Sequence, residues 1–204
     1  MKKSSLLLIL LIVFSTSALS AQPRLGLKLA GGLSSYTGED WNNTTDSMTG
    51  VENKAGFSFS AGALLFLPVG GFLALQPEVL YSSLTGGRID SYSNYIEWRE
   101  QALEVPVYLL LGLPLNNGRV FVMGGPDMLY SFGNVTFTDV DGNQEKYPVD
   151  EDVDNRFRLG YAAGAGFQGQ SLQFAVLYKR SLKSQYNDFE LYNQNISVEL
   201  GILF

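Results

Sequence analysis

The sequence predicts an all-β protein, an eight-stranded antiparallel up-and-down transmembrane β-barrel that follows a cleaved signal peptide. Three observations support this prediction. The chain opens with a basic and then apolar leader, the rest alternates apolar residues with small or polar ones, and short and long connections follow one another in turn. Alternation over four or more residues is the signal of a β-strand, and connections of alternating length are typical of outer-membrane barrels.

The leader predicts export. A basic start, Met1-Lys2-Lys3, precedes an apolar run at 4–14 and a small, polar stretch at 15–21, which is the order of a secretory signal peptide. Cleavage after Ala21, or one residue earlier, removes it. An uncleaved anchor is the alternative, although the apolar run is shorter than the ~20 residues of a spanning helix. The expected domains are a signal peptide at 1–21 and an outer-membrane β-barrel domain at 22–204.

The amino-acid composition argues against several classes of function. The chain has no Cys, so it has no disulfide framework, no thiol chemistry and no lipid anchor on an N-terminal Cys. Without Lys2 and Lys3, 12 basic and 20 acidic residues remain, and this net charge of −8 argues against nucleic-acid binding. The chain also has no His, the usual base beside a Ser nucleophile. We therefore expect no catalytic residues, no cofactor and a protein that is not an enzyme.

Eight segments carry the period of two. One face of each is aliphatic or aromatic, and the other holds Gly, Ala, Ser and a few charges. In a barrel the first face meets lipid and the second fills a narrow lumen, while closure pairs every backbone group. The segment near 119–131 is the least regular, because Gly124-Gly125-Pro126 interrupts it. The other apolar faces, at every second residue, are Leu25–Leu33, Phe57–Leu67, Leu73–Tyr81, Leu103–Leu111, Phe157–Phe167, Leu172–Tyr178 and Ile196–Phe204.

Residues 55–77 could form a β-hairpin or a membrane-spanning helix, and we expect the hairpin. Residues 55–77 hold no charge, and they are numerous enough for a helix that crosses a membrane. However, Pro68-Val69-Gly70-Gly71 is a strong turn signal, and both of its flanks have a period of two. The same reasoning predicts short turns at 68–71, 112–118 and 168–170, and longer loops at 34–53, 85–94, 132–154 and 183–192.

Aromatic residues gather at both ends of the segments, as they do in the girdles at membrane–water boundaries. They are Tyr81, Tyr95, Trp98, Tyr130 and Phe132 near the loops, and Phe72, Phe121, Phe167 and Phe204 near the turns.

Charges on the inward face are the candidate functional residues. A catalytic pair formed by Glu78 and Glu104 is one interpretation. The favoured one is a network of ion pairs inside the lumen, because an isolated buried charge is too costly. The four other charges on this face are Lys28, Arg158, Lys179 and Glu199.

The loop at 132–154 is acidic and offers oxygen ligands for Ca²⁺. Its Gly142 stands too early for an EF-hand loop. A solvated loop is the favoured interpretation, and we expect no metal site. The oxygen-bearing residues are Asp139, Asp141, Asn143, Glu145, Asp150, Glu151, Asp152 and Asp154.

Six segments cover nearly the whole mature chain and follow one pattern: GLKLAGGLSSYTG, KAGFSFSAGALLFLPVGGFLALQPEVLYSSLTGG, LEVPVYLLLGLPL, VFVMGGPDMLYSF, RLGYAAGAGF and ISVELGILF. On these segments, above all QPEVLYS and LEVPVYL, the chain resembles the small outer-membrane β-barrel family of Bacteroidetes that includes PorT-like proteins. The family's usual Lys-Gly is Lys28-Leu29 here. The resemblance implies the cell outer membrane of a Gram-negative bacterium, with outer-membrane lipid and the barrel-assembly machinery as partners.

The resemblance implies little about activity, so three functions stay open. The first is a structural or interaction barrel that contacts envelope partners through its loops. The second is an accessory, PorT-like component of a protein secretion machinery. The third is a narrow channel or a lipid-modifying enzyme.

The C-terminus generates the first testable prediction. Phe204 ends an apolar face and resembles the signal that barrel-assembly machinery reads. Deleting Phe204 removes one interfacial ring, so we expect nearly normal refolding of the purified variant in detergent but poor insertion in cells. Comparable, mild defects in both assays would show that Phe204 is a packing residue only.

Overall fold

The computed structural model describes residues 22–39, 51–85, 88–91, 94–138, 143–149, 155–188 and 190–204. For 51–54, 88–91, 94–98, 135, 137 and 147 only the backbone is described. The predicted signal peptide at 1–21 lies outside this part of the chain. Within it, no helix is long and apolar enough to cross a membrane.

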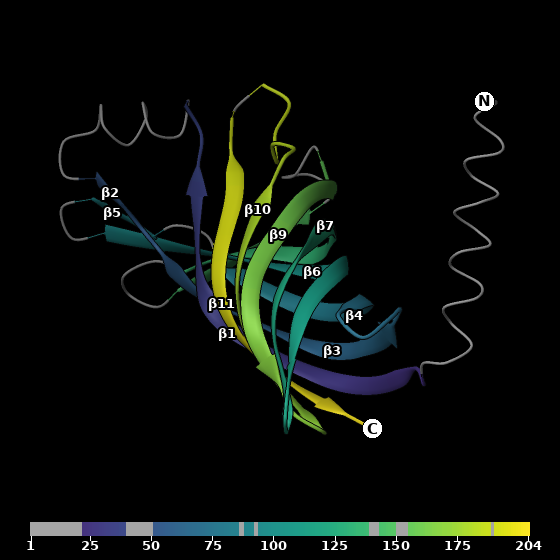
Figure 1. The fold of residues 1–204 in the computed structure, drawn as a ribbon. Helices are drawn as coiled ribbons and strands as arrows, with labels where there is room; N and C mark the ends of the chain where they lie inside the picture. Colours follow the sequence, from purple (N-terminus) through teal and green to yellow (C-terminus); the bar gives the residue numbers. More distant parts are fainter. Residues whose placement is uncertain are drawn as a thin grey trace, which may run out of the picture.

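The described chain forms antiparallel strands, eight of which close into a ring (Figure 1). The order around the ring is β1-β3-β4-β6-β7-β9-β10-β11, and β11 pairs again with β1. The predicted eight-stranded antiparallel barrel is therefore confirmed. The strands are β1 (Arg24–Thr37), β2 (Val51–Lys54), β3 (Gly56–Pro68), β4 (Leu73–Thr85), β5 (Arg88–Ser91), β6 (Asn94–Leu115), β7 (Gly118–Thr138), β8 (Gln144–Pro148), β9 (Phe157–Gln168), β10 (Leu172–Ser181) and β11 (Tyr192–Leu203).

The seam of the barrel joins the two ends of the chain. β1 and β11 pair from Gly26 opposite Leu203 to Thr37 opposite Tyr192. This pairing removes both free edges, so no backbone edge is left for hydrocarbon to meet. The charge-free stretch at 55–77 is the β3–β4 hairpin, with Pro68 opposite Ala74, and the prediction of a hairpin is confirmed.

The two ends of the barrel differ. At one, the turn end, short turns at 69–72, 116–117 and 169–171 join the strands. The predicted turn at 112–118 is shorter than expected because β6 continues to Leu115. At the other, the loop end, β6 and β7 run beyond the ring and pair with three short strands in the order β2-β5-β6-β7-β8. The loops predicted at 34–53, 85–94 and 132–154 therefore contain strands or parts of strands, which corrects that expectation.

A β-bulge marks the place where β7 leaves the barrel wall. Arg99 of β6 lies opposite Thr136, but Gln101 lies opposite Phe132, so three residues of β7 face Glu100 alone. Gly133 in this bulge has a φ of 73°, a conformation that favours glycine. Bulges bend a strand and re-aim its side chains, and this one directs β7 into the outer sheet β2-β5-β6-β7-β8.

The outward face is apolar as predicted. Leu27, Val176 and Val198, for example, are about half exposed, although each belongs to a regular strand.

Among the predicted aromatic residues, Phe72, Phe167 and Phe204 are exposed at the turn end. At the loop end the ring centroids of Tyr81 and Phe132 are 6.2 Å apart, and Tyr130 is exposed. The side chains of Tyr95 and Trp98 lie outside the described residues.

Phe121 is an exception, and its prediction as an interfacial aromatic was wrong. Val120 and Val122 face outward, so Phe121 between them faces the lumen and is only 3% exposed. It belongs to an apolar layer that fills the turn end of the barrel. The inward face is therefore not small throughout: large side chains close this half. The layer consists of Leu64, Phe66, Ala74, Tyr108, Leu110, Phe121, Met123, Ala162, Ala175, Leu177 and Leu203.

Candidate functional site

Six charged side chains from six different strands meet inside the barrel. Strand alternation alone places them there, since even-numbered residues of β1, β4, β6 and β9 and odd-numbered residues of β10 and β11 point inward. All six predicted inward charges are buried, which confirms their predicted orientation. They are Lys28, Glu78, Glu104, Arg158, Lys179 and Glu199.

Five of these residues form one chain of ion pairs, which we call the central network: Glu78, Lys28, Glu199, Lys179 and Glu104. The Nζ of Lys28 donates to both carboxylate oxygens of Glu78, at 2.7 and 2.8 Å, and also pairs with Glu199. The Nζ of Lys179 lies 3.3 Å from Oε1 of Glu199 and pairs with Glu104. Glu199 thus bridges two lysines. Glu78 and Glu104 are not a free acid pair, since each is held by its own lysine.

Neutral side chains add hydrogen bonds to Glu104 and Glu78. Ser82 donates to Oε2 of Glu104 at 2.6 Å, and its Oγ lies 2.8 Å from that of Ser60. On the turn side, Gln76 donates to Glu78 at 2.7 Å. Gln76 and Gln173 also exchange amide hydrogen bonds of 3.2 and 3.0 Å across the lumen. Several hydrogen-bond partners offset the cost of desolvating each of these charges, and an isolated ion pair has no such partners.

A second group of buried residues, the outer cluster, surrounds Glu100 nearer the loop end. Arg158 donates through Nη2 to Oε1 of Glu100 at 2.5 Å, and Ser131 donates to the same oxygen. The hydroxyl of Tyr36 lies 3.4 Å from Oε2 of Glu100. Gln185 donates to that oxygen at 3.2 Å. One carboxylate therefore gathers donors from β1, β7, β9 and the β10–β11 connection.

Gln185 brings the β10–β11 connection down onto the mouth of the lumen. Its side chain is 1% exposed, and its backbone N–H donates to the carbonyl of Leu191 at 3.0 Å. Asn155 donates from its backbone to the carbonyl of Gln185 at 3.1 Å. Ser184 accepts from the backbone N–H of Leu191 at 2.9 Å. These bonds fold the connection into a cap over the outer cluster.

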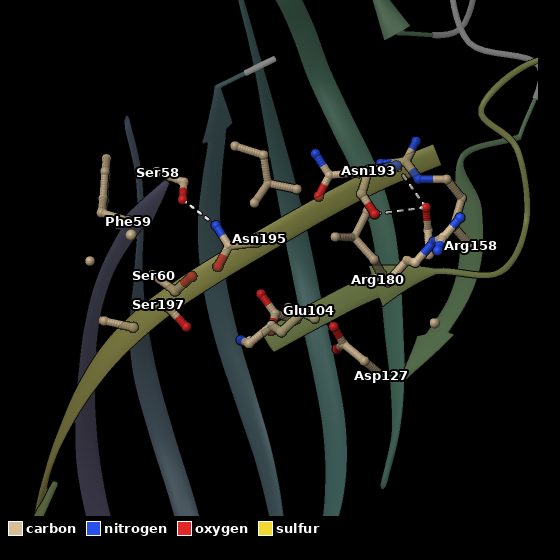
Figure 2. A pocket seen from close by; sticks show the side chains of 18 residues that line it. Ser58, Phe59, Ser60, Glu104, Asp127, Arg158, Arg180, Asn193, Asn195 and Ser197 are labelled. Atoms are coloured by element: carbon tan, nitrogen blue, oxygen red, sulfur yellow. Dashed lines mark hydrogen bonds and ion pairs between the residues drawn. The ribbon is translucent and has the colours of Figure 1, made fainter. Parts of the chain in front are cut away.

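A small polar cavity separates the central network from the outer cluster (Figure 2). Its volume is about 40 Å³, and Glu104, Lys179 and Arg158 line it together with Asp127. One oxygen of Asp127, Oδ1, and one nitrogen of Arg158, Nη1, have no protein hydrogen-bond partner among the described residues. A polar cavity above roughly 10–15 Å³ can hold a water molecule, so this space suits hydration of both groups.

The sequence analysis missed several members of these clusters. Glu100 continues the inward alternation of Ala102 and Glu104, so extending that segment toward the N-terminus would have found it. Gln76 lies within the segment Leu73–Tyr81 and on its inward face, but it carries no charge and was not among the candidate residues. Asp127 follows Gly124-Gly125-Pro126, where the alternation was too irregular to assign a face. Gln185 lies in a connection, where no periodicity exists to orient a side chain.

The loop at 132–154 was considered for Ca²⁺. Asp139, Asp141 and the acidic residues at 150–152 and 154 lie outside the described residues. Within the described part, no group of three or more His, Cys, Asp or Glu is arranged to hold a metal ion.

The central network generates a stability prediction. Glu104→Ala leaves Lys179 with one carboxylate partner instead of two, so we expect a loss of about 3–5 kcal/mol in the free energy of unfolding. Asp188→Ala, an exposed acidic residue in the β10–β11 connection, serves as the control and should change stability by no more than about 0.5 kcal/mol. The measurement is denaturant unfolding of the barrel in lipid vesicles.

A double variant tests whether the loss comes from the pair. Adding Lys179→Ala to Glu104→Ala removes both charges, so the combined loss should be smaller than the sum of the two single losses. An unchanged unfolding midpoint in Glu104→Ala would contradict the network and indicate that Glu104 is solvated.

Comparison with known proteins identifies the family. The model of the outer membrane protein beta-barrel domain matches residues 6–204. A search of curated proteins found no match. Among similar solved structures, Neisserial surface protein A is 8% identical, the match covers 91% of this chain and 99% of that chain, and the TM-score is 0.46. Ail of Yersinia pestis is 13% identical, with 90% of this chain and 99% of that chain covered and a TM-score of 0.42. The N-terminal β-barrel domain of Pseudomonas aeruginosa OprF is 10% identical, with 90% of this chain and 100% of that chain covered and a TM-score of 0.41. The chain belongs to the outer membrane protein β-barrel domain family, and it is located in the outer membrane.

Proposed function

We propose that the protein is a non-catalytic interaction barrel, whose outer sheet β2-β5-β6-β7-β8 binds a partner in the envelope or at the cell surface. The observation that carries this proposal is the contrast between the two parts of the molecule. The barrel interior is filled, whereas the sheet at the loop end is open at two edges. Short turns of such barrels face the periplasm and longer loops face outward, so this sheet lies on the outer side.

The filled interior argues against a pore and against catalysis. The apolar layer closes the turn end, and the central network occupies the middle. The interior of an eight-stranded barrel is just wide enough for side chains to fill it. The carboxylates of the central network and of Glu100 are held by lysine, arginine, serine and glutamine donors, so they lack the freedom that a general acid or base needs.

The open sheet supports the interaction role. β8 pairs with β7 through five residue pairs, from Asn134 opposite Pro148 to Thr138 opposite Gln144. Within the described chain, β8 and β2 each have a strand on one side only. A strand at the edge of a sheet can pair with an extended partner segment through its backbone. The described side chains of β8, at Gln144, Glu145, Lys146 and Pro148, are exposed.

A PorT-like role in secretion is the second candidate, and the resemblance of QPEVLYS and LEVPVYL supports it. These segments lie in β4 and β6 and carry Gln76, Glu78 and Ser82, and Glu104 and Tyr108. Because those residues build the lumen, the same resemblance also has a purely structural explanation. We therefore rank the secretion role second.

Removing the edge strand tests the proposed function. In a variant whose residues 134–148 are replaced by a two-residue Asn-Gly turn, the barrel should keep its heat-modifiable migration on gels. Co-purification from native outer membranes, read by mass spectrometry, should show a partner with the wild type that is lost with this variant.

The control replaces Asn116 and Asn117 in a turn-end connection by Gly and Ser, which should leave the partner bound. Recovery of the wild type as a lone barrel would overturn the interaction role. A stoichiometric secretion complex that survives loss of 134–148 would favour the PorT-like alternative instead.

A further inference from the structure

Asp127 of β7 is a buried carboxylate that belongs neither to the central network nor to the outer cluster. Its side chain is 8% exposed, and its Oδ1 has no hydrogen-bond partner among the described residues. Strand pairing explains this, because Asp127 lies opposite Pro106 of β6 and Gly160 of β9, and neither residue has a side-chain donor. A buried polar atom without a partner is costly, so we expect a partner from outside the chain.

The lumen around Asp127 holds more negative than positive charge. The central network contains three carboxylates and two lysines, and Asp127 adds a fourth carboxylate. Arg158 and Glu100 pair with each other and cancel. With every group ionised, these residues carry two negative charges in excess. Unbalanced charge in a low-dielectric interior is unfavourable, so this part of the lumen attracts a cation.

The basic residues at the polar cavity do not reverse this attraction. Lys179 and Arg158 both line the cavity. However, Lys179 lies against two carboxylates, Glu104 and Glu199, and Arg158 lies against Glu100. Their charges are already part of the balance, which stays negative.

Oxygen atoms line the cavity on two sides. On one side are the carboxylates of Asp127 and Glu104, and on the other the side chains of Ser60 and Asn195 (Figure 2). Asn195 donates through Nδ2 to Ser58, and this bond leaves its amide oxygen for a ligand. Oxygen atoms of this kind are the ligands that hard cations take in proteins.

The size and the charge of the cavity favour a small monovalent ion. Its volume of about 40 Å³ has room for one such ion and a water molecule. In the described part of the chain, no three His, Cys, Asp or Glu are arranged to hold a metal ion, which argues against a divalent cation. An ion on Oδ1 of Asp127, with its water accepting from Nη1 of Arg158, gives both unpartnered atoms a partner.

From the unpartnered carboxylate, the excess charge and the oxygen-lined cavity together, we infer that the lumen holds one monovalent cation of the size of Na⁺ between Asp127, Glu104 and Asn195. The apolar layer closes the turn end, so this ion exchanges with solvent from the loop end and does not cross the barrel. The inference does not depend on the proposed interaction role of the outer sheet.

Exchanging the cation of the medium tests the inference. Full-length mature barrel in lipid vesicles is unfolded with urea at constant ionic strength, either in NaCl or in the chloride of N-methyl-D-glucamine, a cation too large for the cavity. With a dissociation constant of about 10 mM, about 300 mM Na⁺ lowers the unfolding equilibrium constant about thirtyfold, because the ion binds the folded state only. The wild-type midpoint should therefore rise with Na⁺. Asp127→Asn keeps the side-chain size but removes the charge, and it should show no such rise.

Asp188→Asn is the matched control, because it makes the same change at an exposed position of the β10–β11 connection. It should respond to Na⁺ as the wild type does. Equal responses of the wild type and Asp127→Asn would overturn the inference, as would a wild type that does not respond.

Two further measurements complete the test. A wild-type midpoint that ignores Na⁺ but falls as the pH rises, with Asp127→Asn insensitive to pH, would overturn the inference by making a proton the counter-charge. If Asp127→Asn does not refold, equilibrium dialysis of the wild type against radioactive Na⁺ decides. One bound ion per barrel supports the site, and none overturns it.

Discussion

The cost of burying charge inside a narrow ring is the constraint on which the rest of this structure depends. A closed eight-stranded barrel gives each strand one face toward lipid and one toward the lumen. Lys28, Lys179 and Glu199 therefore cannot reach bulk water, and they are stable only in contact with one another and with Glu78 and Glu104. The ion pairs are a consequence of closure.

The central network also constrains strand register. Lys28 on β1 contacts Glu78 on β4 and Glu199 on β11, so one side chain connects three strands. Sliding one strand by a single residue would turn its charges toward lipid and its leucines toward the lumen. Replacing buried ion pairs by apolar residues can leave stability unchanged. The contribution of the ion pairs in this barrel is to strand register, because only one register forms all of them together.

Sequence alone predicts the barrel well, because the outward face obeys one rule for every strand. Leu27, Val176 and Val198 follow the period of two, and so do the inward Lys28 and Glu104. The rule fails where the environment is not uniform. Phe121 was assigned to the interface because aromatic residues at strand ends suit both environments. The short strands β2, β5 and β8 fall largely in segments that were expected as loops, since polar residues outside the membrane carry no alternation.

Most of the charged residues in the lumen could be predicted from the sequence, but the groups that they contact could not. Periodicity gives the face of Glu104 but cannot say that Lys179 and Ser82 are the groups it meets, because this depends on tilt and register across the ring. Gln185 shows the limit most clearly: its capping contact with Glu100 joins a connection to a strand 85 positions away.

Paired charges and the apolar layer close the lumen, and planar-bilayer conductance tests this closure directly. Purified wild-type barrel, inserted in a defined orientation and bathed in symmetric KCl, should give no stepwise current above that of the bare bilayer. Stable, reproducible open steps from the wild-type protein would contradict this account, since they require a continuous aqueous path through the central network and past Leu64, Phe66 and Phe121.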